Sequence, residues 1–272
     1  SRIMALDKNS NGFTFGFAII LVVVVGAALS LTAMGLKPMQ DKNATDKKMI
    51  DIIGAVNVQA TRANAQEMYT KHVKESFVVD SEGNIKEGVD AFGVDVKKEY
   101  KDKSLSAADK NYPVFVTEVE GETYYVLPLA GVGLWGPIWG FVGLKGDYQT
   151  VFGAKFDHKG ETPGLGAEIK KDIFQAQFAD KQLNYGGDLL FEVTKGAGSS
   201  STNYQVDGIT GGTITSKGVE EMLNRCLGVY SKYFEKLKAA EEAKAAKAAG
   251  VLEAVEEVVE EATSEVQTET NE

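Results

Sequence analysis

Cysteine and histidine are scarce in this 272-residue chain, which contains one cysteine, Cys226, and two histidines, His72 and His158. A single thiol cannot form an internal disulfide, a cysteine–metal cluster or an iron–sulfur centre within the chain. Two histidines also argue against a histidine-rich metal site. We therefore expect no metal site, and we interpret Cys226 as a buried residue of a helix.

The chain also lacks an excess of positive charge, because 29 Lys and Arg stand against 39 Asp and Glu, for a net charge of −10. Ten Glu and two Lys put −8 of that charge into residues 241–272 and leave the remainder close to neutral. This balance indicates no nucleic-acid partner. We interpret the acidic, low-complexity tail as a solvated or disordered extension, with a partner-binding helix as the alternative.

One segment lacks charge altogether. Residues 13–36 are 24 residues long, and their polar side chains are Thr14, Ser30 and Thr32. As a helix of about 1.5 Å per residue, the segment is long enough for the ~30 Å hydrocarbon core of a bilayer. We expect a retained membrane helix, with a signal peptide as the rival interpretation. Two basic residues precede the segment and four follow it closely, which weakly favours a cytoplasmic position for the rest of the chain.

The remaining sequence predicts an α+β fold, in which an antiparallel sheet is flanked by helices. Pro38 is expected to mark a bend or a restart, and helices are expected near residues 45–53 and at 59–76. Apolar and β-branched stretches predict hairpins at 77–86 and 112–129 and further strands at 141–145, 150–157 and 189–194. Helices are expected at 167–179 and at 217–240, where the second closes the domain.

One glycine- and hydroxyl-rich stretch lies directly before the last of these helices: Asp207-Gly208-Ile209-Thr210-Gly211-Gly212-Thr213-Ile214-Thr215-Ser216. Its paired glycines permit a close approach of the backbone or a positive φ. The helix N-terminus behind them supplies unpaired N–H groups and the positive end of a dipole, which favour an anion such as phosphate. We interpret the stretch as a site for a phosphate-bearing ligand; alternatively, Thr215 or Ser216 simply caps the helix.

A second loop is shaped by three glycines and a proline: His158-Lys159-Gly160-Glu161-Thr162-Pro163-Gly164-Leu165-Gly166. It ends where a helix is expected to start, so it offers further free N–H groups. A ring system can lie against such a backbone, with Glu161 or Thr162 at its polar edge. The alternative is a plain strand-to-helix turn with a solvated His158.

Together the two motifs resemble the flavin-binding domain of the C subunit of the sodium-translocating NADH:quinone reductase. The resemblance includes the apolar span, the Lys37-Pro38 exit and Gly133-Leu134-Trp135, and it covers about residues 10–235. It implies five parts: a cytoplasmic N-terminus at 1–12, a transmembrane helix at 13–36, a mixed membrane-proximal part at 37–111, a soluble FMN-binding domain at 112–240 and the acidic tail at 241–272.

The family attaches FMN covalently, through its phosphate, to the last threonine of an Asp-x-x-Ser/Thr-Gly-Ala-Thr motif. The resemblance therefore implies a phosphoester on Thr213, with Thr215 as the nearest alternative acceptor and Gly212 in place of the usual alanine. The residues implied to bind the cofactor are Asp207, Thr210, Gly211, Gly212, Thr213, Thr215, Lys217, Glu161, Thr162, Gly164, Leu165, Gly166 and Trp135. No residue is expected to act as a general acid or base, because the flavin carries the electrons.

The resemblance further implies a single-pass protein of the bacterial inner membrane, with its globular domain in the periplasm. The charge count favours the opposite side, but long domains translocate largely regardless of flanking charge. The implied partners are the other subunits of the reductase, a flavin transferase and membrane lipid. Two alternatives remain: the G-type subunit of an Rnf ferredoxin:NAD oxidoreductase, which shares the second motif, and a membrane-anchored scaffold without a cofactor.

Overall fold

The computed structural model describes residues 11–196 and 198–269, with side chains described as far as Lys247. The chain divides into two units, Ser1–Met49 and Ile50–Glu272. The predicted cytoplasmic N-terminus at 1–12 lies almost entirely outside the described residues, as do the last three residues of the acidic tail.

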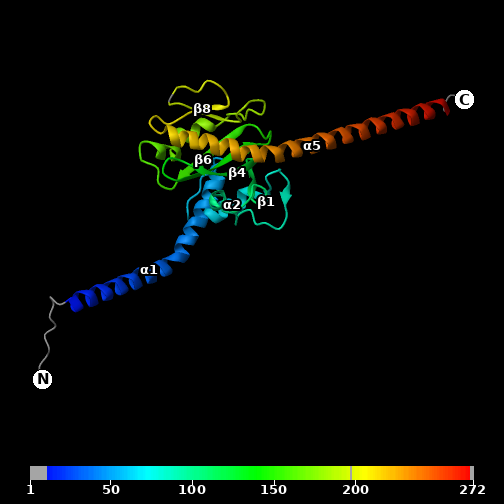
Figure 1. Cartoon of the computed structure of the whole chain (residues 1–272). Helices are drawn as coiled ribbons and strands as arrows, with labels where there is room; N and C mark the ends of the chain where they lie inside the picture. Colours follow the sequence, from blue (N-terminus) through cyan, green and yellow to red (C-terminus); the bar gives the residue numbers. More distant parts are fainter. Residues whose placement is uncertain (1–10, 197, 270–272) are drawn as a thin grey trace. The chain divides into compact units, whose positions relative to one another are not determined.

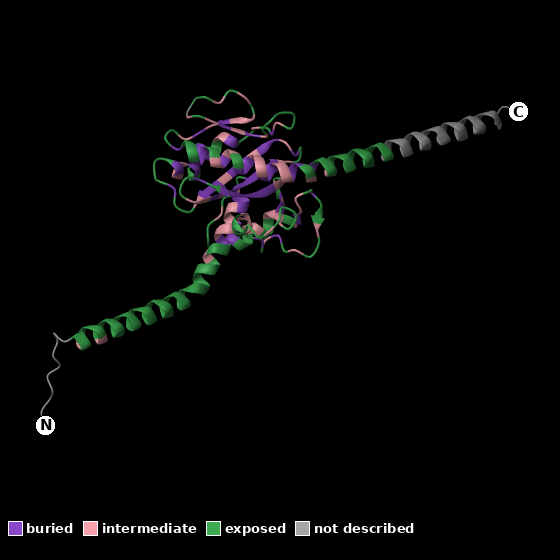
Figure 2. Cartoon of the chain, viewed as in Figure 1, coloured by how far each residue is buried: buried purple, intermediate pink, exposed green. Residues whose placement is uncertain are grey.

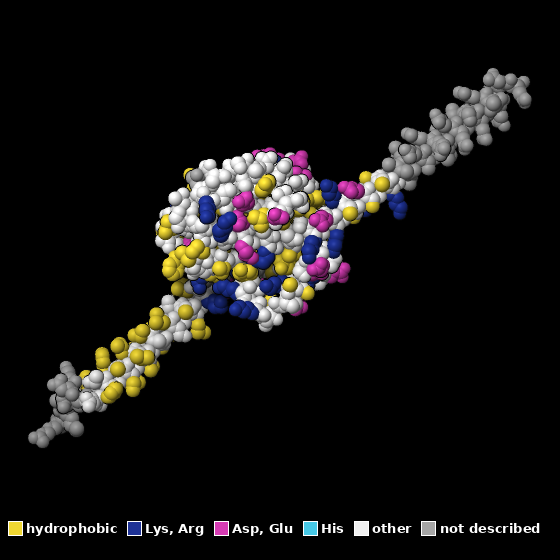
Figure 3. Space-filling view, turned by 45° about the horizontal axis from the view of Figure 1, so that its top comes forward, with side chains coloured by type: hydrophobic (Ala, Val, Ile, Leu, Met, Phe, Trp, Pro, Cys, Tyr) yellow, Lys and Arg dark blue, Asp and Glu magenta, His cyan; other side chains and the backbone are white. Residues whose placement is uncertain are grey.

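Helix α1 (Asn11–Gly54) is one continuous helix of 44 residues that contains Pro38. The expected restart at this proline is therefore wrong. Its immediate neighbours Lys37, Met39 and Gln40 are good helix formers, and they carry the helix past the position where the N–H donor is missing. The apolar side chains of the first part are exposed along its length (Figure 3). Among the described helices, α1 is the one long and apolar enough to cross a membrane.

A six-stranded antiparallel sheet forms the centre of the second unit, in the order β2-β1-β3-β4-β5-β6 (Figure 1). Its strands are β1 (Val73–Val79), β2 (Ile85–Lys86), β3 (Tyr112–Val119), β4 (Glu122–Val132), β5 (Pro137–Lys145) and β6 (Val151–His158). Both predicted hairpins are confirmed. A tight turn connects β4 to β5, because β4 ends at Val132, which pairs with Pro137 at the start of β5. Because β1 pairs with β3, residues before 112 belong to the same sheet as those after it.

Of the helix expected at 59–76, the structure forms residues 65–72 as a helix and places residues 73–76 in a strand. Helix α2 (Ala65–His72) ends where β1 begins, and α3 (Val96–Lys101) follows the β1–β2 hairpin. Residues 73–79 pair with β3, and Val78 and Val79 are fully buried. Burial against the sheet outweighs the local helical pattern, because helix propensity is a weak preference that tertiary contacts override.

The two faces of the sheet have separate hydrophobic cores, as alternation along the strands requires. Val114, Leu127 and Val142 face α5, while their neighbours Phe115, Val126 and Phe141 face the opposite core, which contains the end of α1. Figure 2 shows the buried residues concentrated in these layers. Helix α5 lies so close to β4 that a Cβ added to Gly131 would be 2.8 Å from Met222 Cβ.

Between β6 and α5 the structure departs from the prediction. The helix expected at 167–179 is three short pieces, η1 (Gly166–Lys170), α4 (Asp172–Gln175) and η2 (Ala176–Phe178), because Lys171 is extended, with φ −81° and ψ 146°. The strand expected at 189–194 is β7 (Glu192–Thr194), which pairs in parallel with β8 (Gln205–Asp207). The buried side chain of Gln175 links these short pieces to β6, because it donates to the carbonyls of Phe156 and Ile169.

Helix α5 (Thr213–Glu269) begins four residues earlier than expected and continues well past Ala240. The tail from Glu241 is therefore helical as far as it is described, and its side chains through Lys247 are exposed. Cys226 is buried on this helix, as expected. The α+β fold with an N-terminal apolar helix and a helix-flanked antiparallel sheet is confirmed.

Candidate functional site

The glycine-rich motif forms the turn that starts α5. Gly211 has a φ of +75°, and the N–H of Gly212 donates to the carbonyl of Ile209 at 2.9 Å. The N–H of Ser216 donates to the carbonyl of Gly212 at 2.9 Å, which is the first helical bond of α5. Gly212 therefore occupies the capping position, and the alternative in which Thr215 or Ser216 caps the helix is wrong. Thr213 is the first residue of the helix.

The motif has four hydroxyls, and the three that lie in the first turn of α5 have different environments. Thr213 is exposed, whereas Thr215 is 1% and Ser216 is 2% exposed. Thr215 Oγ1 donates to Glu161 Oε2 at 2.6 Å, and Ser216 Oγ accepts the N–H of Ile209 at 2.9 Å. Both buried hydroxyls are thus committed to the protein itself. Of the three, Thr213 alone presents its hydroxyl to solvent, at the end of a helix where N–H groups lack helical acceptors.

Glu161 joins three segments of the chain beneath this helix start. Its carboxylate is 5% exposed and accepts the N–H of Trp135 at 2.8 Å as well as the hydroxyl of Thr215. The N–H of Leu134 points at the same hydroxyl, at 3.4 Å. The sequence suggested that Glu161 lies at the open polar edge of a bound ring, whereas the structure buries it. It holds the β4–β5 turn and its own loop against α5.

Two further contacts fix the loop that carries Glu161. The N–H of Glu161 donates to His158 Nδ1 at 3.0 Å, so His158 is a structural acceptor and not merely solvated. The carbonyl of Thr162 accepts the N–H groups of Leu165 and Ala167, both at 3.1 Å. The loop is a rigid turn whose outer residues, from Thr162 to Leu165, remain exposed.

Glycine is required where these segments meet. A Cβ on Gly133 would lie 2.7 Å from Glu161 Oε1, and one on Gly166 would lie 2.5 Å from Thr215 Oγ1 and closer still to Glu161 Oε2. A Cβ on Gly212 would lie 2.9 Å from Ile209 Cγ2. The usual alanine of the motif would therefore crowd Ile209 at this position, and Gly212 leaves room for that side chain.

Four exposed apolar side chains lie on the segments joined in this way: Leu134 at 51%, Trp135 at 67%, Leu165 at 42% and Ile214 at 60%. A Cβ on Gly211 would be 2.8 Å from Leu165 Cδ2, so this leucine lies directly against the motif. Large exposed apolar groups clustered beside a helix N-terminus suit a ligand with a flat apolar ring and an anionic end. FMN has both parts, so the residues present fit it.

Three further predicted residues have environments of their own. Asp207 accepts the N–H groups of Gly198, Ser199 and Ser200, which holds the pKa of its carboxyl below the usual range. The ammonium of Lys217 pairs with Glu220 at 2.8 Å. Thr210 is exposed and has no hydrogen-bond partner within the described part of the chain. Asp207 therefore shapes the neighbouring loop, and Lys217 is neutralised by a carboxylate of its own helix.

Gly133, Ser216 and Ile214 belong to this site but were not among the residues predicted to bind the cofactor, although the motifs contained them. The signal for Gly133 was its place in a strand-rich, glycine-dense stretch, which often marks a close backbone approach. Ser216 and Ile214 gave no separable signal, because their roles depend on the helix starting at Thr213 and not at Lys217.

Comparison with known proteins identifies the relatives of this chain. Residues 133–228, which contain nearly the whole site, match the FMN-binding domain family. The C subunit of the Na(+)-translocating NADH-quinone reductase of Haemophilus ducreyi is 32% identical, over 86% of this chain and 96% of that protein. That of Pseudomonas aeruginosa is 30% identical, over 82% and 93%. The crystal structure of the corresponding C subunit from Parabacteroides distasonis is 42% identical, with a TM-score of 0.66 over 73% of this chain and 96% of that one.

Proposed function

The chain belongs to the family of the C subunit of the Na(+)-translocating NADH-quinone reductase, part of an oxidoreductase complex, and from this premise we propose that it relays electrons through an FMN bound covalently to Thr213. The single observation that carries the choice of residue is the difference between the two candidate hydroxyls. That of Thr213 is exposed, and that of Thr215 is buried and donates to Glu161 at 2.6 Å. A transferase can reach the first without unfolding the site.

The first turn of α5 favours the phosphodiester that this attachment creates. The attached phosphate carries about one negative charge, and a helix N-terminus stabilises such a charge by about 0.3–1 kcal/mol at an exposed position. The backbone N–H groups of the first turn are available as donors, because no carbonyl of a preceding helical turn accepts them. Lys217 contributes less than the sequence suggested, because Glu220 already neutralises it.

The remaining residues hold the ring and limit its exposure. Trp135 and Leu165 present apolar surface on the two segments that meet the motif, and the buried carboxylate of Glu161 fixes the positions of both segments. FMN supplies the redox chemistry when it is bound, and it can transfer electrons singly. The chain's own part is to orient the flavin at the edge of the domain, where a redox partner can approach.

We place the protein in the bacterial inner membrane, anchored by α1, with the globular domain in the periplasm. The apolar helix and the family support the anchoring. The family resemblance is the ground for proposing the periplasmic side of the membrane. The partners that follow are the other subunits of the reductase, membrane lipid and a flavin transferase that attaches the FMN.

Replacing the acceptor tests the proposal. The full chain is co-expressed with the flavin transferase and examined for flavin fluorescence in a denaturing gel, where only covalently bound flavin remains. We expect Thr213→Ala to lose the signal completely. Thr215→Ala removes the alternative acceptor and weakens the fold, but it should retain the signal per molecule of folded protein. Loss with Thr215→Ala and retention with Thr213→Ala would reverse the assignment.

The side of the membrane has its own test. External protease is added to cells whose outer membrane has been permeabilised. We expect the domain to be degraded. A protected domain would refute the periplasmic placement and leave the flavin proposal untouched.

A further inference from the structure

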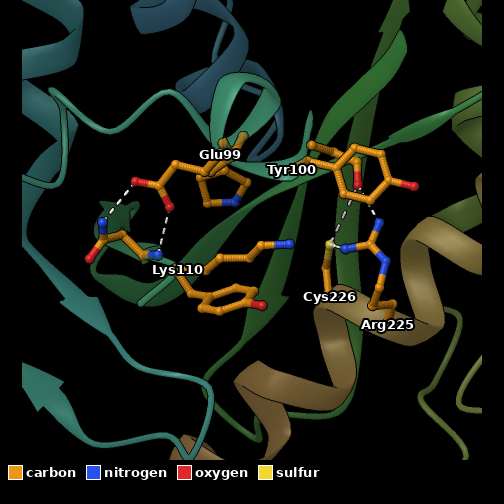
Figure 4. A pocket seen from close by; sticks show the side chains of 10 residues that line it. Glu99, Tyr100, Lys110, Arg225 and Cys226 are labelled. Carbon is orange, nitrogen blue, oxygen red and sulfur yellow. Dashed lines mark hydrogen bonds between the residues drawn. The ribbon is translucent and has the colours of Figure 1, made fainter. Parts of the chain in front are cut away.

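A second pocket lies away from the flavin site, among α3, the start of β3, β4 and α5 (Figure 4). Its volume is about 30 Å³, enough for one or two water-sized groups. The walls combine the two rings of Tyr100 and Tyr112 with the charged side chains of Lys110 and Arg225. None of its lining residues belongs to the flavin site, so nothing in the proposed function uses this pocket.

Arg225 is held rigidly at one side of the pocket. Its guanidinium carbon lies 4.3 Å from the centre of the Tyr100 ring, and Nη2 donates to the carbonyl of Ala130 at 2.5 Å. Nε donates to Glu221 at 2.6 Å. Beside it, burial raises the pKa of the Cys226 thiol, so the thiol stays protonated and adds no negative charge to the wall. Glu221 balances the charge of this guanidinium, and Nη1 also donates to Cys226 Sγ at 3.4 Å. Arg225 therefore offers the pocket a fixed hydrogen-bond donor, and the unbalanced positive charge comes from Lys110.

Lys110, unlike Arg225, is a cation without an anionic partner among the described residues. Its ammonium lies 6.0 Å from the centre of the same Tyr100 ring and forms no ion pair with any residue that the structure describes. The carboxylate on the wall, Glu99, accepts the backbone N–H and the side-chain amide of Asn111, both at 2.7 Å, and forms no ion pair with Lys110. Figure 4 shows the Lys110 ammonium and the Arg225 guanidinium next to each other below the Tyr100 ring.

The positive charge extends beyond the pocket. Residues 96–110 contain five Lys against Glu99, Asp102 and Asp109, for a net charge of +2, in a chain whose net charge is −10. Each of the three acids accepts a hydrogen bond from a neighbouring residue. Glu99 binds Asn111, Asp102 accepts the hydroxyl of Ser104 at 2.6 Å, and Asp109 accepts the hydroxyl of Ser106 at 2.7 Å. The lysines, which are Lys97, Lys98, Lys101, Lys103 and Lys110, form no ion pairs within the described residues, although Lys97 lies over the Trp139 ring at 4.3 Å.

We propose that this pocket and the lysines around it are a docking site for an acidic segment of a protein partner, with one side-chain carboxylate lying between Lys110 and Arg225. A carboxylate group matches the small volume and the two converging donors. The lysines outside the pocket would be superfluous for a single small anion. Because these lysines lie within fourteen residues of the chain, they suit several acidic side chains in succession and would steer such a segment toward the pocket.

The test uses the full chain in detergent micelles and a fluorescein-labelled hexaglutamate peptide, with binding followed by fluorescence anisotropy. Lys110→Gln removes the unpaired charge, and Lys238→Gln removes an exposed lysine on α5 that forms no ion pair within the described residues. We expect Lys110→Gln to weaken hexaglutamate binding about tenfold and Lys238→Gln by less than about twofold. Lys110→Arg should restore most of the affinity, which separates loss of charge from damage to the fold.

Two further probes identify the ligand. A labelled hexaglutamine peptide should bind at least about tenfold more weakly than hexaglutamate, since it lacks the charge. Free glutarate should displace the labelled hexaglutamate only when its carboxylate groups are present at a far higher concentration than those of the peptide. Equal binding of hexaglutamate to the parent and to Lys110→Gln, or binding no tighter than that of hexaglutamine, would overturn the proposal. Competition by glutarate at an equal concentration of carboxylate would replace the docking site by a small-molecule site and refute it as stated.

Discussion

Replacing Thr215 by valine tests whether the buried contact between Thr215 and Glu161 holds the flavin site together. Valine has nearly the same shape, so the substitution removes the hydroxyl and leaves the packing. Glu161 is 5% exposed and Thr215 is 1% exposed, so solvent cannot replace the lost donor. Hydrogen bonds to charged groups contribute about 1.5–3 kcal/mol, and a buried acceptor left without its donor adds to the loss. We expect the free energy of unfolding to fall by about 2–3 kcal/mol.

Thermal unfolding of the full chain in detergent measures this loss. For a domain of this size, about 2–3 kcal/mol lowers the midpoint by roughly 4–12 °C. Thr210→Val is the matched control, because Thr210 is exposed in the same motif and has no hydrogen-bond partner within the described residues. Its effect should stay within about 0.5 kcal/mol. Equal midpoints for the two variants would refute the idea that Glu161 and Thr215 stabilise this site.

Two other predictions concern the same region. Gly166→Ala should lower the free energy of unfolding by about 1–3 kcal/mol, because its Cβ would lie 2.5 Å from Thr215 Oγ1, whereas Gly160→Ala meets nothing within 4 Å and should have little effect in the same unfolding assay. Asp207 has a lowered pKa in the folded chain, so its stabilisation of residues 198–200 is present above the pKa of the unfolded chain and is lost as pH falls through the folded value. Amide exchange of these residues, corrected for the intrinsic pH dependence, should show constant protection between pH 7 and 5 and a loss only in stronger acid, and Asp207→Asn should remove that pH dependence.

The strands could be predicted from the sequence because their side chains alternate between two buried faces. Phe115 and Val126 on one face, with Val114 and Leu127 on the other, give β3 and β4 the β-branched and aromatic pattern that defines a hairpin. The segment 59–76 was mispredicted because Val73–Val79 forms a strand only through pairing with β3, more than thirty residues later in the chain. Pairing over such a distance has no local signature.

The site was predicted in composition but not in its internal contacts. The glycines and hydroxyls of the motif indicated an anion beside a helix start, and the structure places that start at Thr213. The sequence did not reveal that Glu161 binds Thr215, because the two residues are 54 positions apart. It also could not show that Asp207 and Lys217 have partners of their own, since both look like free charges beside the motif.

The most direct test of the flavin assignment is peptide mass spectrometry of the full chain after co-expression with the flavin transferase. Trypsin should release residues 196–217 as one peptide, which contains both candidate threonines. The account predicts that this peptide gains the mass of FMN less one water and that its fragment ions locate the addition on Thr213. An addition on Thr215, or an unmodified peptide from protein that contains flavin, would contradict it.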